Sequence, residues 1–273
     1  MRNEAPQIKT MELTYRGKAF DIEYFHREGD KGTILLLHGL GGAKENYWEA
    51  CKSPSLKGFT LICPDNPGTG NSTYDDNFPL DVDDLANITC LFIDQLEPEQ
   101  FILVGTSMGG LTALLYLRGT GASKVKAFIN IEGNLMTEDC MFSSKVVAYD
   151  LETFAGTIFP ETISNMRNNG NAGFRIIANN LQLNTSVSSY YHYSFQTVAY
   201  SSSGELLEQY LCLDIPRLFI YGEENKQLSY LPLMLEKGMN VKEISESNHF
   251  VFYDHPKELY EVIGIFIERS RET

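Results

Sequence analysis

Cysteines, basic residues and long apolar runs are all scarce in this sequence. Its 273 residues include five cysteines, an odd number without CxxC spacing, which argues against a disulfide framework and a cysteine zinc site. Only 22 lysines and arginines stand against 36 aspartates and glutamates, so the net charge is −14. A field of this sign repels phosphate backbones and anionic lipids, and we therefore expect neither a nucleic-acid partner nor a membrane partner.

Two further absences bear on location and on cofactors. No apolar stretch approaches the length that spans a bilayer, and residues 1–20 carry scattered charges without the apolar core of a signal peptide. These features predict a cytoplasmic protein with reduced thiols, and they leave room for a homodimer. The HExxH, Walker and dinucleotide-binding patterns are missing, so we expect no metal and no cofactor.

The sequence does contain an alternation of short apolar runs and amphipathic stretches. The runs are apolar at nearly every position, as in parallel strands covered on both faces, and they cover Ile34–Leu37, Thr60–Cys63, Phe101–Val104, Ala127–Ile131 and Leu218–Tyr221. Amphipathic periodicity predicts helices over 81–96, 108–118, 228–237 and 256–269. Residues 11–26 alternate like a hairpin. Strands and helices in this order predict a doubly wound α/β fold.

The alternation stops between residues 133 and 214, where asparagine, serine, glycine and aromatic residues dominate. The aromatic content argues against disorder, so we predict an ordered, partly helical cap. This divides the chain into a core of residues 1–132, a cap of residues 133–214 and a second core segment of residues 215–273. Aromatic residues of the cap are expected either to line a lid or to form its own core: Tyr190, Tyr191, Tyr193, Phe195 and Tyr200.

The strongest local motif is Gly105–Gly109, which reads Gly-Thr-Ser-Met-Gly between a predicted strand and a predicted helix. A serine on such a sharp turn has its hydroxyl exposed at the carboxyl end of the sheet, and the flanking glycines avoid a Cβ clash. The N-terminus of the following helix offers N–H groups to a developing oxyanion. Ser107 is therefore the candidate nucleophile.

Three more motifs accompany this turn in a consistent order. His38–Gly42 and Pro64–Ser72 each follow a predicted strand, and Ser247–Phe250 precedes the last helix. Together with the Ser107 turn, they resemble the HGxGG loop, the DxxGxGxS loop and the histidine segment of α/β-hydrolase-fold serine hydrolases. The resemblance covers nearly the whole chain apart from the cap. It implies a mostly parallel eight-stranded sheet with the cap inserted after the sixth strand.

A serine nucleophile needs a base, because its hydroxyl is protonated at neutral pH. The resemblance implies that His249 is this base and that His38 is structural. Of the other histidines, His26 belongs to the predicted hairpin and His255 to a helix start, where solvated or capping positions are expected. His192 falls in the cap, where it would either line the pocket or pack against other cap residues.

The resemblance also implies an oxyanion hole made of two backbone N–H groups. One belongs to Met108, directly after the nucleophile, and the other to Leu40, directly after the His-Gly pair. Because the chemistry would use only the backbone of these residues, we expect their apolar side chains to shape the floor of the pocket.

The acid of the triad departs from the common family pattern. The position three residues after the glycine that ends the seventh strand is Asn225, a neutral amide. Glu223 and Glu224 lie beside it, and Glu132 lies at the end of the sixth strand, the second place where the fold accommodates an acid. A carboxylate at the end of a buried strand is costly without a partner. We therefore predict that Glu132 bonds Nδ1 of His249, with Glu224 as the alternative acid and Glu223 after it.

These residues predict a serine hydrolase that cleaves a small ester, thioester, lactone or amide through an acyl-enzyme. Serine at the nucleophile position excludes the aspartate chemistry of dehalogenases and epoxide hydrolases. A C–C hydrolase or a cofactor-free perhydrolase would use the same triad, because fold and triad do not fix the substrate. A ligand receptor without activity is the alternative from another functional class.

Overall fold

The computed structural model describes residues 5–271 and contains one sheet of eight strands. Their order is β1-β2-β4-β3-β5-β6-β7-β8, and only the pairs β1–β2 and β2–β4 are antiparallel. The strands are β1 (Gln7–Tyr15), β2 (Lys18–Arg27), β3 (Thr33–Leu37), β4 (Thr60–Pro64), β5 (Phe101–Thr106), β6 (Val125–Ile131), β7 (Arg217–Gly222) and β8 (Asn240–Ile244). The predicted doubly wound, mostly parallel α/β fold is confirmed.

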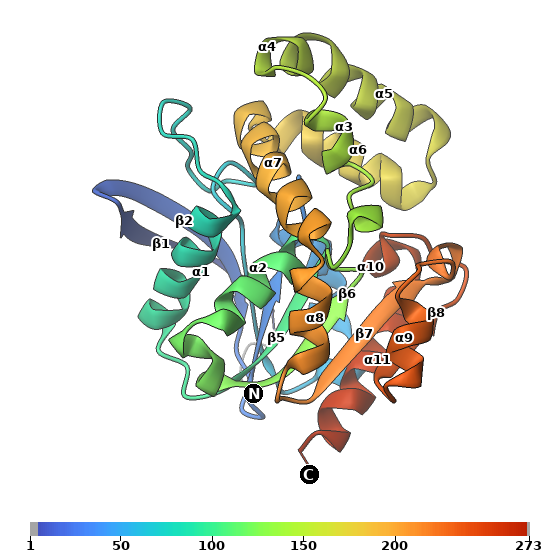
Figure 1. Cartoon of the computed structure of the whole chain (residues 1–273). Coiled ribbons are helices and arrows are strands. Elements are labelled where there is room, and N and C mark those ends of the chain that lie inside the picture. The colour runs from blue at the N-terminus through green and yellow to red at the C-terminus, as the bar shows by residue number, and fades with distance from the viewer. Residues whose placement is uncertain (1–4, 272–273) are drawn as a thin grey trace.

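Eleven α-helices lie within residues 5–271 (Figure 1). They are α1 (Val82–Leu96), α2 (Met108–Arg118), α3 (Ser143–Val146), α4 (Leu151–Thr153), α5 (Phe159–Asn169), α6 (Ala172–Asn184), α7 (Val187–Ser203), α8 (Glu205–Cys212), α9 (Leu231–Glu236), α10 (Val251–Asp254) and α11 (Pro256–Arg269). Other helical segments include η1 (Lys44–Lys52), η5 (Phe154–Ile158) and η6 (Glu223–Asn225). The helices predicted at 81–96, 108–118, 228–237 and 256–269 correspond to α1, α2, α9 and α11.

Helices cover both faces of the sheet, which explains why its central parallel strands β3, β5 and β6 are largely apolar and buried. Alternate side chains of β5 belong to opposite layers: Ile102 and Val104 pack with η1, α10 and α11, whereas Phe101 and Leu103 pack with α1, α2, α8 and α9. A strand between two helical layers must be apolar at successive positions, as residues 101–104 are. Packing on both faces therefore fixes the positions of the carboxyl ends of these strands.

Helices α3 to α8 all lie between β6 and β7, within the segment predicted as the cap. Figure 1 shows α3 to α7 gathered above one end of the sheet, while α8 runs down beside α2. Tyr210 of α8 is buried and its ring contacts Phe128 and Phe219 of the sheet. The last helix of the segment thus packs on the core, and the earlier helices form the part that overhangs it.

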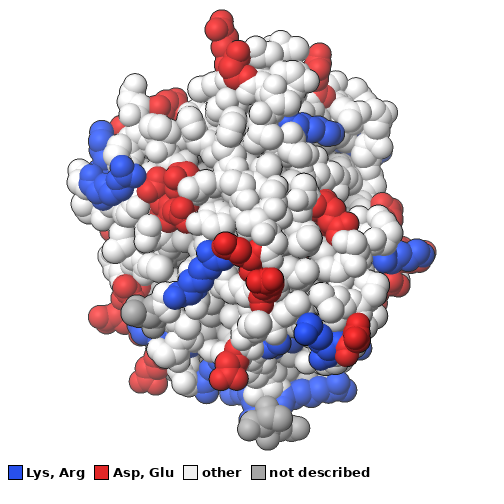
Figure 2. All heavy atoms as spheres, viewed as in Figure 1, with Lys and Arg blue, Asp and Glu red and all other residues white. Residues whose placement is uncertain are grey.

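The surface over these helices is mostly uncharged on the face drawn in Figure 2. Lysine, arginine, aspartate and glutamate are scattered over the rest of that face, with both signs present. Between residues 5 and 271, no helix combines the length and the apolar character needed to cross a membrane.

Candidate active site

Ser107 lies at the sharp turn between β5 and α2. Its backbone has φ 53° and ψ −126°, a conformation that costs an L-residue about 1–3 kcal/mol. Its carbonyl oxygen accepts hydrogen bonds from the backbone N–H groups of Gly110, at 2.8 Å, and Asn134, at 3.2 Å. A Cβ on Gly109 would lie 2.2 Å from the carbonyl oxygen of Leu37, so only glycine fits there. The surrounding backbone therefore holds the strained turn in place.

The loop after β3 lies directly against Ser107. A Cβ on Gly39 would be 2.9 Å from the Cβ of Ser107, so the absence of a side chain lets the two segments meet. Leu40 and Met108 line the same cavity as Ser107. Within residues 5–271, neither of their backbone N–H groups donates to an acceptor of the protein. Two N–H groups are thus available next to the serine.

A buried ion cluster fixes the end of this loop. The Lys44 ammonium lies 2.8 Å from Asp65, 2.6 Å from Glu23 and 3.0 Å from Glu45. The Lys44 backbone N–H also donates to Asp65, at 2.6 Å. Burial alone would lower the pKa of Lys44, but these carboxylates outweigh it and raise that pKa above its ordinary value. The cluster joins the loop beside Ser107 to the loop after β4.

Replacing Lys44 by methionine should destabilise the fold by about 3–5 kcal/mol, because it leaves the Asp65 carboxylate buried without its cation. Urea unfolding of the purified variant measures the loss. Lys52→Met is the matched control on the same helix η1: its exposed pair with Glu49 should contribute less than about 1 kcal/mol. Equal losses in the two variants would contradict a structural role for the cluster.

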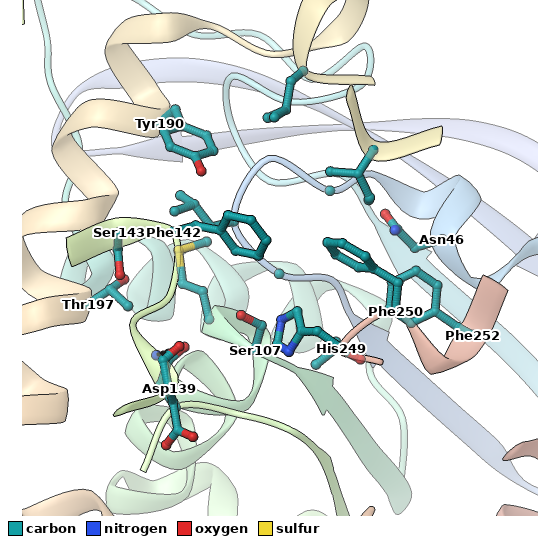
Figure 3. A pocket seen from close by; sticks show the side chains of 18 of the residues that line it. Asn46, Ser107, Asp139, Phe142, Ser143, Tyr190, Thr197, His249, Phe250 and Phe252 are labelled. Atoms are coloured by element: carbon teal, nitrogen blue, oxygen red, sulfur yellow. Dashed lines mark hydrogen bonds between the residues drawn. The ribbon is translucent and has the colours of Figure 1, made fainter. Parts of the chain in front are cut away.

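His249 lies on the loop between β8 and α10, and its neighbours are fixed by hydrogen bonds. The backbone N–H of Asn248 donates to Asp254, at 3.1 Å, and the N–H of Phe250 donates to the Asn248 side chain, at 2.9 Å. The His249 ring is buried and lines the same cavity as Ser107, as Figure 3 shows. Ser107 and His249, which are 142 positions apart in the sequence, thus lie in the same cavity at one end of the sheet.

Glu132 follows β6 and bonds directly to this histidine. His249 Nδ1 donates to Glu132 Oε2 at 2.6 Å, which is the hydrogen bond expected from the sequence. A carboxylate on Nδ1 holds the proton there and leaves Nε2 for the cavity. Oε1 of Glu132 accepts from the backbone N–H of Gly222, at 2.7 Å, and the Asn225 amide donates to both carboxylate oxygens, at 2.9 Å each.

These donors decide the charge of Glu132. Burial would raise the pKa of the carboxyl group, but the hydrogen bond and charge of His249 oppose it, as do the bonds from Asn225 and Gly222. The net effect holds the pKa of Glu132 below its ordinary value, so the group is a carboxylate at neutral pH. Asn225, at the position where the resemblance implies an aspartate, therefore serves here as a donor to the Glu132 carboxylate.

The two alternative carboxylates point elsewhere. Glu223 accepts a hydrogen bond from the backbone N–H of Glu246, at 3.0 Å, and lies 3.9 Å from the Lys226 ammonium. Glu224 is exposed, and its backbone N–H donates to the Ser247 carbonyl. Neither side chain is bonded to His249.

None of the other four histidines lines the cavity beside Ser107. His38 is buried, its Nε2 accepts from the backbone N–H of Asn66 at 3.0 Å, and burial lowers its pKa, so it is neutral and structural. His26 is bonded to Lys9 on the β1–β2 hairpin, and His255 directly precedes α11. His192 packs against the Tyr191 ring and is not among the residues that line the cavity.

The cavity beside Ser107 is narrow, with a volume of about 30 Å³. About half of the residues that line it have apolar or aromatic side chains: Leu40, Met108, Phe142, Met166, Ile177, Leu181, Tyr190, Phe250 and Phe252. The Tyr190 hydroxyl points into it in Figure 3. Asp139 also contributes to the wall, but its carboxylate is bonded to two backbone N–H groups and to Tyr230. The lining therefore suits a small, largely apolar group.

The cap aromatics divide between the two expected roles. Tyr190 lines the cavity, whereas the buried Tyr193 donates to the Pro67 carbonyl at 3.0 Å and joins the core beneath. Tyr200 bonds to Asp83 and Phe195 is 42% exposed, so neither faces the cavity. Sequence reasoning did not single out Phe142, Met166, Ile177 or Leu181, because these residues meet only through the packing of separate helices.

The comparisons with known proteins agree with this architecture. The family model described as alpha/beta hydrolase fold matches residues 32–256. Proline iminopeptidase of Lactobacillus delbrueckii subsp. lactis is 34% identical over 108 residues, which are 37% of this chain and 35% of that protein. A monoacylglycerol lipase of Homo sapiens is 35% identical over 99 residues, 36% of this chain and 29% of that protein. The matches span about a third of these relatives.

Solved structures are similar over nearly the whole chain. A bromoperoxidase from Bacillus anthracis has a TM-score of 0.76 at 17% identity, covering 95% of this chain and 100% of that one. An esterase from Exiguobacterium antarcticum has a TM-score of 0.72 at 20% identity, covering 91% and 96%. At identities this low the similarity establishes the fold alone, because proteins with this fold catalyse several different reactions. The family match and this architecture together show that the chain belongs to the alpha/beta hydrolase fold family.

Proposed function

We propose that this chain is a serine hydrolase that cleaves a small ester, thioester, lactone or amide through an acyl-enzyme. The observation that carries the proposal is the buried Glu132–His249 hydrogen bond beside a strained serine in one cavity. A binding protein without activity has no need for a charged carboxylate behind a histidine, whereas an imidazole that becomes positive during turnover does.

In this mechanism His249 Nε2 accepts the proton of the Ser107 hydroxyl as Oγ attacks the carbonyl carbon. The bond to the leaving group then breaks, and the leaving group takes that proton from His249. Water, deprotonated by His249, then attacks the acyl carbon. The bond from this carbon to Ser107 Oγ breaks, the acid leaves, and Oγ takes the proton back from His249. The N–H groups of Leu40 and Met108 stabilise the oxyanion in both steps. Glu132 stabilises the imidazolium without accepting its proton.

The helices of residues 133–214 act as a cap in this proposal. Met166 of α5, Ile177 and Leu181 of α6 and Tyr190 of α7 all belong to the cavity wall opposite the sheet. A cap of apolar side chains excludes water and strengthens the electrostatic interactions at the reacting carbonyl. Its lining would then set which acyl groups enter.

A fluorophosphonate probe and a substrate panel test the proposal together. The panel holds p-nitrophenyl acetate, a thioester and a lactone, with proline p-nitroanilide and a monoacylglycerol added because of the names of the two relatives. We expect a single probe adduct per chain by intact mass, and turnover of at least one acyl substrate with a burst of leaving group. If the folded protein gives no adduct and no turnover, the proposal is refuted. Ligand binding in the absence of both would favour a receptor.

A further inference from the structure

We infer that Phe142 is a barrier that restricts the substrate to short acyl groups, and that the groove behind this ring is a second subsite that Phe142 closes off from Ser107. The inference rests on the proposed function. A groove of about 790 Å³ adjoins the narrow cavity, and residues of α3, α5 and α6 line much of it. Two residues line both spaces, Phe142 and Met166. They are the wall between the cavity at Ser107 and the groove.

Phe142 is held against the catalytic histidine by other rings. It lies on the turn before α3, and its ring centroid is 6.1 Å from that of His249. It is stacked on Phe250 at 6.0 Å and contacts Phe174 at 6.2 Å. Figure 3 shows its ring inside the wall above His249. An aromatic ring with three ring neighbours packs in a defined position, so it is a fixed barrier in this structure.

The two volumes give the substrate class. The cavity at Ser107, at about 30 Å³, is by far the smaller of the two spaces, so it admits only a short acyl chain. We assign an acetyl or propionyl group to it. The groove is many times larger, and apolar side chains such as Ile158 and Phe174 line part of it. Removing the Phe142 ring would join the spaces and admit a chain of eight carbons or more.

A chain-length profile tests this assignment. The ratio of kcat/KM for p-nitrophenyl octanoate to that for the acetate is measured in the parent, in Phe142→Ala and in Met166→Ala. We expect the parent to prefer acetate and the ratio to rise at least tenfold in Phe142→Ala, with a smaller rise in Met166→Ala. Phe195→Ala is the matched control, since this cap phenylalanine lines neither space, and its ratio should stay within twofold of the parent's.

An unchanged ratio in both wall variants, or an equal rise in Phe195→Ala, would overturn the inference. Phe142→Leu, which keeps an apolar side chain, covers the case in which the alanine variant does not fold. Calorimetric binding of octanoate separates this inference from the proposed function, because it needs no turnover. If no variant hydrolyses any ester, tighter octanoate binding by at least tenfold in Phe142→Ala still supports the barrier, and equal binding refutes it.

Discussion

Ser107→Ala is expected to abolish fluorophosphonate labelling and to lower kcat by about 10⁴-fold or more, because the acyl-enzyme that we propose forms on Ser107 Oγ. The fold should survive, because alanine has the same Cβ and imposes the same backbone strain at φ 53°. Intact mass spectrometry measures the adduct, and thermal unfolding checks the fold.

Ser143→Ala is the control for this experiment, because Ser143 is the other serine in the wall of the cavity among the described residues. This variant should still acquire one adduct. Labelling that persists in Ser107→Ala and disappears in Ser143→Ala would move the nucleophile to α3.

Glu132→Gln should lower kcat by about 10⁴-fold while KM changes little. Glutamine keeps the size of the side chain but has no charge to stabilise the imidazolium. Its amide group would also place donors against the Asn225 amide and the Gly222 N–H, which now bond the carboxylate. Steady-state kinetics measures the loss.

Glu224→Gln is the matched control for the acid, and its kcat should stay within about twofold of the parent's, because this exposed side chain is not bonded to His249. A large loss in Glu224→Gln and none in Glu132→Gln would reassign the acid to the loop after β7.

Glu132→Gln should also change how the free energy of unfolding depends on pH. The pKa of Glu132 in the folded state lies below 4.5, its ordinary value. Its charge therefore stabilises the fold at pH values above about 4.5, and this contribution is lost as the pH falls through the lower pKa of the folded state. The stability difference between the parent and Glu132→Gln should therefore shrink on acidification. A difference that is constant from pH 7 to pH 3 would contradict a charged Glu132.

The core of the fold was predictable from sequence because its signals are local. Phe101–Thr106, the Ser107 turn and α2 follow one another directly, and each carries its own pattern of apolar residues or glycine. The pairing of Glu132 with His249 was also predictable, since an acidic residue at the end of a buried strand requires a partner. The donor role of Asn225 was harder to foresee, because the departure from aspartate was visible but its hydrogen bonds were not.

The inner surface of the cap was not predictable in this way. Phe142, Met166, Leu181 and Tyr190 come from four separate elements, and only tertiary packing brings them to one cavity. Aromatic residues are equally common in the wall of a lid and in its core, so composition could not separate Tyr190 from Tyr193. Lys44 gave no sequence signal either, because two of its three carboxylate partners, Glu23 and Asp65, depend on the approach of β2 and the loop after β4.

The Asn225–Glu132 contact has an evolutionary consequence. An aspartate at position 225 would lose the amide that donates to both oxygens of Glu132, and it would set two carboxylates against each other. If Glu132 is the acid, as we propose, we expect a carboxylate at position 225 to be incompatible with a charged Glu132. A substitution to aspartate at position 225 would therefore call for a second substitution at position 132, which couples the two positions.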